Sequence, residues 1–166
     1  MLPAYIPNPV AAIIGGGTPI DLGNRFWDGR RIFGNGKTYR GFLVGVGSGI
    51  AVGVVQIAIQ PAVSGVGLPS HTYLSVFLLS LGALSGDLIK SFLKRRAGKE
   101  QGERWPVADQ YDLVAGGFLF LALFDLSWLI ATIDAVRLFW ILILTPVLHR
   151  VVNIIGYATG IKDVPW

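Results

Sequence analysis

The chain has 166 residues, of which 52% are hydrophobic and only 14% are charged, and its formal net charge is +4. Average soluble domains carry about 25% charged residues, so this composition excludes an ordinary soluble domain. Because the chain has no cysteine and only two histidines, disulfides, thiolate metal sites, cysteine nucleophiles and three-histidine zinc sites are excluded as well.

The distribution of charge predicts membrane-spanning helices. No charged residue occurs in the 46 residues from Gly41 to Gly86, which is enough for two spans of about 20 residues each. Helices are expected rather than a barrel because no segment alternates apolar and polar residues. We therefore predict an all-α integral membrane protein, a single membrane-embedded domain over residues 1–166 with five transmembrane helices. The expected spans lie at about residues 2–16, 41–60, 72–95, 112–133 and 137–157.

The first span, which contains Pro7 and Pro9, leads into a polar loop over residues 15–40 that is rich in glycine, asparagine and arginine. Glycine lets such a backbone fold closely around a ligand. Arg25, Arg30 and Arg31 of this loop either follow the positive-inside rule or bind anionic headgroups. Its other polar side chains supply donors and acceptors for a ligand, and they are Asp21, Asn24, Asp28, Asn35, Lys37, Thr38 and Arg40.

Small residues mark the faces where the second and third spans are expected to pack. Glycine recurs every fourth residue in the second span and twice at the same interval in the third. Residues at this spacing lie on one helix face and allow two backbones to approach closely in a membrane. The positions are Gly41, Gly45, Gly49, Gly53, Gly82 and Gly86.

Asp87 ends the charge-free run and lies inside the third span. Charge within a membrane is costly, so such a residue is a candidate site. At 100° per residue, Lys90, Ser91 and Lys94 lie on the same side of the helix as Asp87. Either this stripe forms a functional site, or Asp87 pairs with Lys90 or Ser91 while Lys94 extends to the membrane surface.

A second polar loop separates the third and fourth spans and is rich in both lysine and arginine. Asp109 and Asp112 lie near one face of the helix that is expected to follow it. These residues either cap that helix or join Asp87 as ligands for Mg²⁺, which prefers carboxylate and phosphate oxygens. Carboxylates beside a cluster of cations favour a complex of metal and polyphosphate.

Polar residues in the last two spans have no assigned role. Asp125 is expected about 13 residues into the fourth helix. His149, Arg150 and Asn153 follow Pro146 in the fifth, and the depth of Arg150 suggests that it faces the same polar cavity as Asp87.

The basic residues predict the orientation. The first polar loop holds five, and the end of the third span with its following loop holds six, whereas the loops on the other side hold only Arg137. The positive-inside rule then places both polar loops and the C-terminus in the cytoplasm and the N-terminus outside.

Residues 85–112, SGDLIKSFLKRRAGKEQGERWPVADQYD, resemble the signature of CTP-dependent lipid cytidylyltransferases. The form with Trp105-Pro106 before Asp109-Gln110-Tyr111-Asp112 is most similar to the CDP-archaeol synthase family, whose other hallmark resembles Asn24 to Gly41. The resemblance covers essentially the whole chain. The His-Gly-Gly that precedes the metal aspartates of CDP-diacylglycerol synthases is absent, which argues against a diacyl lipid as the substrate.

The resemblance implies an Mg²⁺-dependent nucleotidyltransferase in the cell membrane with its active site facing the cytoplasm. Its partners would be CTP and 2,3-bis-O-geranylgeranyl-sn-glycerol 1-phosphate, with no nucleic acid, and its products unsaturated CDP-archaeol and pyrophosphate. Asp87, Asp109 and Asp112 would bind metal, and Lys94 and Arg95 would share in catalysis. The implied substrate-binding residues are Asn24, Asp28, Asn35, Lys37, Thr38, Arg40, Ser91, Lys99 and Trp105.

The alternative is an anion or lipid-headgroup transporter with a cationic cytoplasmic vestibule. It explains intramembrane charge and glycine-lined helices. It does not explain why carboxylates cluster beside the cations, or why the charge lies almost wholly on one side.

Overall fold

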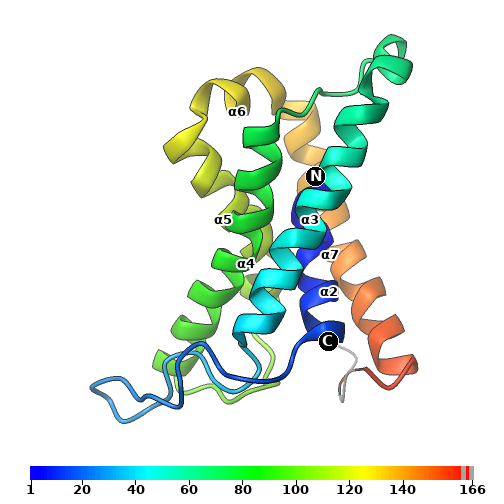
Figure 1. The fold of residues 1–166 in the computed structure, drawn as a ribbon. Helices are drawn as coiled ribbons and strands as arrows, with labels where there is room; N and C mark the ends of the chain where they lie inside the picture. The colour runs from blue at the N-terminus through cyan, green and yellow to red at the C-terminus, as the bar shows by residue number, and fades with distance from the viewer. Residues whose placement is uncertain (162–163, 165–166) are drawn as a thin grey trace.

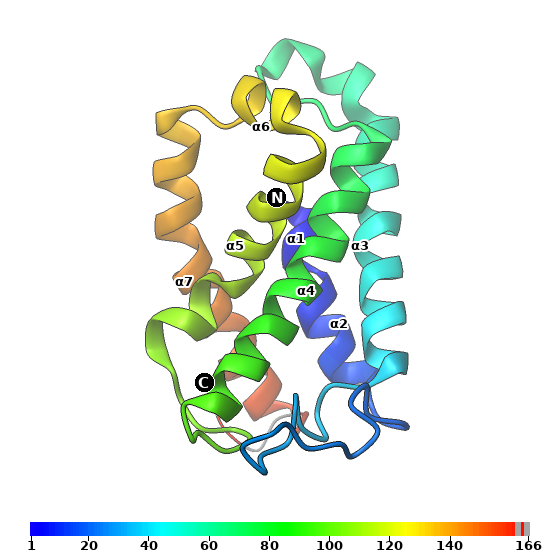
Figure 2. The ribbon, with the colours of Figure 1, turned by 90° about the vertical axis from the view of Figure 1, so that its left-hand side faces the viewer.

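A computed structural model describes residues 1–161 and residue 164 of the chain. This part of the chain is helical, with long helices running side by side and polar loops gathered at one end (Figures 1 and 2). The helices are α1 (Leu2–Tyr5), α2 (Pro7–Ile14), α3 (Tyr39–Ile59), the 3₁₀ helix η1 (Gln60–Val66), α4 (Tyr73–Arg96), α5 (Pro106–Phe124), α6 (Leu126–Thr132) and α7 (Ala135–Ala158).

Four helical segments are long and apolar enough to cross a membrane, namely Tyr39–Val63, Tyr73–Arg96, Pro106–Phe124 and Ala135–Ala158. The first predicted span is shorter. Together, α1 and α2 cover Leu2–Ile14, about 20 Å of helix against about 30 Å of hydrocarbon. The N-terminus lies midway along the bundle, and α2 runs from there toward the end that carries the polar loops (Figures 1 and 2). An all-α membrane protein is thus confirmed, whereas the fifth span stays a prediction.

The fourth predicted span differs most from the structure. A single helix was expected over residues 112–133, but α5 already begins at Pro106, because proline is well suited to the first turn of a helix. The chain then turns at Asp125, whose carboxylate accepts the N–H of Trp128 at 3.3 Å and caps α6. Asp125 therefore lies between two helices, where aspartate is a favoured cap, and the prediction that it sits inside one is wrong.

The predicted glycine faces are confirmed as sites of close helix contact. Gly45 on α3 faces α2, where a Cβ atom would lie 2.8 Å from the carbonyl oxygen of Pro7. Gly82 on α4 faces α5, where a Cβ atom would lie 2.6 Å from the carbonyl oxygen of Gly116 and 2.8 Å from the Cα of Gly117. Because these neighbours are backbone atoms, they cannot rotate away.

We expect Gly82→Val to destabilise the folded chain by about 3 kcal/mol, at the upper end of the cost of overpacking, because two backbones would have to separate. Gly47 on α3 is the matched control, since a Cβ there would meet nothing within 4 Å. Thermal unfolding in detergent should show a lowered Tm for Gly82→Val and little change for Gly47→Val. Equal losses would show that the α4–α5 contact is not specially close.

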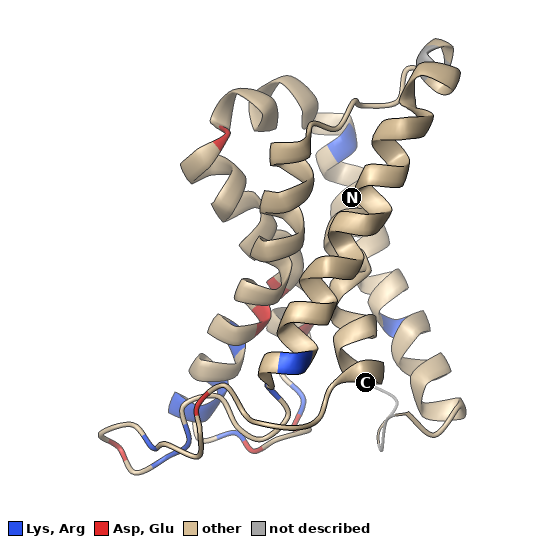
Figure 3. Cartoon of the chain, in the orientation of Figure 1, with Lys and Arg blue, Asp and Glu red and all other residues tan. Residues whose placement is uncertain are grey.

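Charged side chains gather at the end of the bundle that carries the two polar loops, and the rest of the helical surface is almost free of them (Figure 3). The apolar core lies between the helices, away from this charged end, and Leu79, Ala83 and Leu121 are fully buried in it. The charged end is therefore where a polar site can form.

Candidate active site

A cavity of about 350 Å³ lies at the charged end, lined by residues of all the helices except η1 and α6 and by residues of both polar loops. We refer to it as the main cavity. Leu84, Leu88 and Phe42 contribute apolar walls. Its polar and charged lining consists of Tyr5, Asn8, Lys37, Thr38, Asp87, Lys90, Lys94, Glu103, Asp109, Asp112, Thr145, His149 and Asn153.

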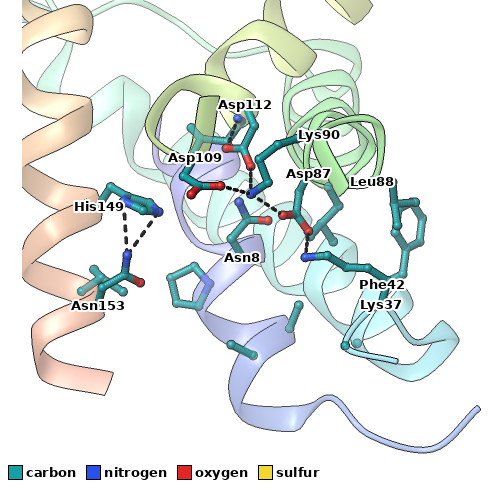
Figure 4. Close-up of a pocket in the computed structure, with 18 of the residues that line it drawn as sticks. Asn8, Lys37, Phe42, Asp87, Leu88, Lys90, Asp109, Asp112, His149 and Asn153 are labelled. Carbon is teal, nitrogen blue, oxygen red and sulfur yellow. Dashed lines mark hydrogen bonds and ion pairs between the residues drawn. The ribbon is translucent and has the colours of Figure 1, made fainter. Parts of the chain in front are cut away.

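Lys90 lies at the centre of the charged lining. Its Nζ is 2.9 Å from Oδ1 of Asp87, 2.6 Å from Oδ2 of Asp112 and 3.5 Å from Oδ1 of Asp109, so three carboxylates surround one ammonium group (Figure 4). The side chain of Asp112 is only 2% exposed and that of Lys90 15%. Lys90 is not among the site residues predicted from the sequence. Its spacing of three from Asp87, which places both on one side of α4, is the feature of the sequence that indicates it.

Two further lysines complete the arrangement. Nζ of Lys37 is 2.5 Å from Oδ2 of Asp87, and Nζ of Lys94 is 2.6 Å from Oδ1 of Asp109 and also donates to the carbonyl of Glu103 at 2.7 Å. Three ammonium groups therefore neutralise three carboxylates, as burial of charge requires. We call these six residues the Asp–Lys cluster, and its members are Asp87, Asp109, Asp112, Lys37, Lys90 and Lys94.

The carboxylates of the Asp–Lys cluster are the predicted metal ligands. Among the described residues, no three Asp, Glu or His side chains are spaced as a ready-made metal site. The donor set nevertheless suits a hard cation, because carboxylate oxygens from two helices already point at a single positive charge, the ammonium of Lys90. One of the two alternatives for Asp109 is seen directly, because its Oδ2 accepts the N–H of Trp105 at 2.7 Å, where α5 begins. Its binding of metal stays a prediction.

The first polar loop is built around Asp21, which is buried. Its carboxylate pairs with Arg31 at 2.5 Å and accepts the backbone N–H groups of Phe33 at 3.0 Å and Gly34 at 2.9 Å. Close by, the N–H of Ile20 donates to the carbonyl of Lys37 at 2.8 Å. Asp21 thus fixes the backbone that delivers Lys37 to the main cavity.

Burial of the Asp21 carboxyl raises its pKa, but the hydrogen bonds from Arg31, Gly34 and Phe33 lower the pKa by more than burial raises it. The pKa of Asp21 therefore lies well below its usual range. For a carboxyl with a depressed pKa, the stabilisation is present above about pH 4, the pKa of the unfolded chain, and is lost as pH falls toward the folded value. We expect the amides of the loop to be well protected from hydrogen exchange at pH 5, and their protection relative to an unfolded peptide at the same pH to fall below about pH 3. Asp21→Asn should speed exchange at pH 5, and equal protection in both chains would contradict this role.

The same loop is fastened to the end of α4. Arg96 pairs with Asp28 at 3.0 Å and donates to the carbonyl of Arg31 at 2.6 Å, and its guanidinium lies 4.8 Å from the ring centre of Phe26. Arg30 donates in return to the carbonyl of Arg95 at 3.1 Å. These arginines therefore hold the two polar loops together, an explanation that neither of the sequence-based alternatives offered.

The structure brings only part of the predicted substrate-binding set to the main cavity. Lys37 and Thr38 line it, whereas the other predicted substrate-binding residues and Arg95 do not. Ser91 donates to the carbonyl of Asp87 at 2.8 Å, and Arg95 donates to the carbonyl of Lys99 at 2.6 Å. Their predicted contacts with substrate stay predictions. The residues that do not line the cavity are Asn24, Asp28, Asn35, Arg40, Ser91, Arg95, Lys99 and Trp105.

The wall opposite the Asp–Lys cluster comes from α7. Asn153 is buried and its Nδ2 lies 3.2 Å from Nδ1 of His149, and Figure 4 shows both across the cavity from Asp109. Their spacing of four places both side chains on one face of a largely apolar helix, which is the signal in the sequence for this wall. Arg150 does not line the main cavity as suggested but an adjoining hollow.

The family model described as "CarS-like: CDP-archaeol synthase" matches residues 1–166, the whole chain. The chain belongs to the CDP-archaeol synthase family. The CDP-archaeol synthase of Methanoculleus marisnigri is 61% identical and that of Methanosphaerula palustris 58% identical, each over all 166 residues and the full length of the relative. The predicted resemblance to this family is thereby confirmed.

A solved structure described as an intramembrane enzyme for archaeal membrane lipid biosynthesis is also similar. It is 33% identical in sequence, with a TM-score of 0.66, and the match covers 98% of this chain and 90% of that one. Membership of the CDP-archaeol synthase family and this likeness together agree with the multi-pass architecture seen here.

Proposed function

We propose that this chain transfers the cytidylyl group of CTP to the phosphate of an archaeal ether lipid and releases pyrophosphate. The class of reaction is supported by membership of the CDP-archaeol synthase family, whose model and relatives match the full length of the chain. The composition of the Asp–Lys cluster supports it as the site of that reaction, since the cluster combines carboxylates with cations that can bind phosphate. We propose 2,3-bis-O-geranylgeranyl-sn-glycerol 1-phosphate as the acceptor, in line with the sequence resemblance.

The residues suit this chemistry. An oxygen of the lipid phosphate forms a bond to the α-phosphorus of CTP while the bond from that phosphorus to the pyrophosphate oxygen breaks, and pyrophosphate leaves with the electron pair. The attacking oxygen is already anionic, so no general base is required. The barrier is the approach of two anions and the charge on the leaving group, which Lys37, Lys90 and Lys94 can lower by electrostatic stabilisation.

We propose that Asp87, Asp109 and Asp112 hold Mg²⁺ in the working enzyme. The fit rests on their oxygen donors and on their convergence around one cation. Mg²⁺ held by these carboxylates would supply positive charge to the triphosphate. The ammonium groups of Lys90 and Lys37, which neutralise these carboxylates now, would then become available to phosphate oxygens.

We also propose that the charged end of the bundle faces the cytoplasm of the cell and that the N-terminal helix is a fifth membrane-embedded segment. The excess of basic residues in the two polar loops supports the orientation. With this placement CTP enters from the cytosol, and the isoprenoid chains of the acceptor stay among the lipids.

The test is a reaction with purified components. Protein in detergent should release pyrophosphate when given CTP, Mg²⁺ and the geranylgeranyl glycerol phosphate, and should release far less with other nucleotides or without the lipid. If no lipid phosphate supports turnover, while vesicles containing the protein pass anions, the transporter alternative is favoured.

The stereochemical course tests the proposed direct transfer. We expect inversion at the α-phosphorus when a chiral α-phosphorothioate of CTP is the donor, because a single in-line displacement inverts the configuration. Phosphorus NMR of the product after stereospecific conversion measures it. Retention would require a covalent enzyme intermediate and would remove the proposed course.

A further inference from the structure

A second hollow, of about 240 Å³, adjoins the main cavity and has no part in the roles described so far. It lies between the start of α5 and the end of α7, and we call it the side hollow. Asp109, His149 and Asn153 line both spaces, so the two adjoin at these side chains. A group bound in the side hollow would therefore lie next to one bound in the main cavity.

The chemistry of the side hollow suits an anion. Arg104 enters from the second polar loop and Arg150 from α7, and they join the polar side chains of Gln110, His149 and Asn153. Among the described residues of the lining, Asp109 is the one acidic side chain, and its charge is met by Lys94 at 2.6 Å. Guanidinium groups bind phosphate oxygens through paired hydrogen bonds, so two arginines beside these polar side chains form a phosphate-binding lining.

The surroundings of the side hollow suit a lipid. Arg150 is exposed, so the hollow reaches the surface of a helix that is apolar enough to cross a membrane. On that helix Val151 is 46% exposed, Ile154 47% and Ile155 55%. A ligand with its phosphate in the hollow can thus lay apolar chains along α7 without leaving the hydrocarbon.

We infer that the side hollow is the acceptor subsite, which binds the phosphomonoester of the lipid while the main cavity holds the nucleotide. This inference rests on the proposed function. Arg104 and Arg150 neutralise the acceptor, and His149 and Asn153 form the boundary across which its oxygen reaches the α-phosphorus. The two anionic substrates are then bound by different cations, with the lysines of the Asp–Lys cluster on one side and the arginines on the other.

Arg150→Gln tests the inference kinetically. We expect the KM for the lipid phosphate to rise by about tenfold or more, because a charge-assisted contact to phosphate is lost, while kcat and the KM for CTP change by less than about twofold. Arg150→Lys should recover part of the loss. Arg137→Gln, at the other end of the same helix, is the matched control and should leave all constants unchanged.

Two results would overturn the inference. An unchanged KM for the lipid would show that the side hollow does not bind the acceptor. A raised KM for CTP, or weaker inhibition by pyrophosphate, with the lipid KM constant, would show that the arginines bind nucleotide phosphates instead.

A binding experiment without CTP keeps this test independent of turnover. In native mass spectrometry, wild-type protein should retain the geranylgeranyl glycerol phosphate, Arg150→Gln should retain much less, and neither should retain the same diether lipid without its phosphate. If inorganic phosphate displaced the lipid phosphate at equal concentration, the hollow would have no preference for the lipid. It would then be a site for free anions, which would refute the acceptor subsite. If the lipid binds in this way but no turnover occurs, the proposed function fails and the subsite stands.

Discussion

Asp87→Asn is expected to lower the rate of pyrophosphate release by about 10²–10³-fold or more while the protein stays folded, because the loss of one preorganised electrostatic partner costs this much. The Asp87 carboxylate holds Lys37 at 2.5 Å and Lys90 at 2.9 Å, so the substitution releases two cations at once. It also removes one of the three proposed metal ligands. A pyrophosphate-release assay, with size-exclusion chromatography to verify folding, measures the effect.

The matched control for Asp87→Asn is Asp125→Asn, at the opposite end of the bundle. Asn caps a helix about as well as Asp, so the cap of α6 should be retained and the rate unchanged. A rate for Asp87→Asn within tenfold of wild type would mean that the Asp–Lys cluster is not the reaction centre.

Lys90→Met is expected to make stability depend strongly on metal. Without the ammonium of Lys90, the carboxylates of Asp87 and Asp112 lose the cation that they share at 2.9 Å and 2.6 Å. Removing one partner of a buried ionic arrangement costs about 3–5 kcal/mol, so the Tm in a metal chelator should fall steeply. Added Mg²⁺ should restore much of it, because a ligand that binds only the folded state stabilises that state.

The stability control is Lys99→Met, which removes an exposed ion pair with Glu103 and should cost less than about 1 kcal/mol. The wild-type protein should show a smaller gain from Mg²⁺ than Lys90→Met, because it must give up the lysine contacts when metal binds. If Mg²⁺ raised the Tm of both proteins equally, Lys90 would not occupy the metal position.

The sequence was sufficient to predict which acidic residues meet. Asp87 and Asp112 lie on different helices, yet the end of the charge-free run and the Asp109–Asp112 spacing identified them. Helical periodicity also placed Lys90 and Lys94 beside Asp87, and the glycines of α4 indicated the face that packs on α5. The predictions for Lys90, Lys94 and the glycines depend on spacing within one helix, which the sequence contains directly.

Contacts between distant segments were harder to predict. Arg96 could not be assigned to Asp28, because the pair forms only once the first loop folds back onto the end of α4. Likewise, His149 enters the main cavity through the rotation of α7, which depends on how that helix packs. The break at Asp125 was missed because the apolar run continues across it.

The arrangement of charge explains why a polar site persists inside an apolar bundle. Each carboxylate of the Asp–Lys cluster has an ammonium group within 3.0 Å, so no charge is buried alone. Under the proposed function, metal or phosphate that binds these side chains would replace contacts between the carboxylates and the lysines. The cluster would then act as a set of exchangeable ion pairs.

The most direct test of the account is a crystal structure of the protein with Mn²⁺ and a CTP analogue whose α–β bridge cannot be cleaved. We expect an anomalous Mn²⁺ peak beside the carboxylate of Asp87 in the main cavity, with the triphosphate next to Lys37 and Lys94. Nucleotide and metal bound elsewhere on the chain, with the Asp–Lys cluster unchanged, would contradict the proposal that these six side chains form the reaction centre.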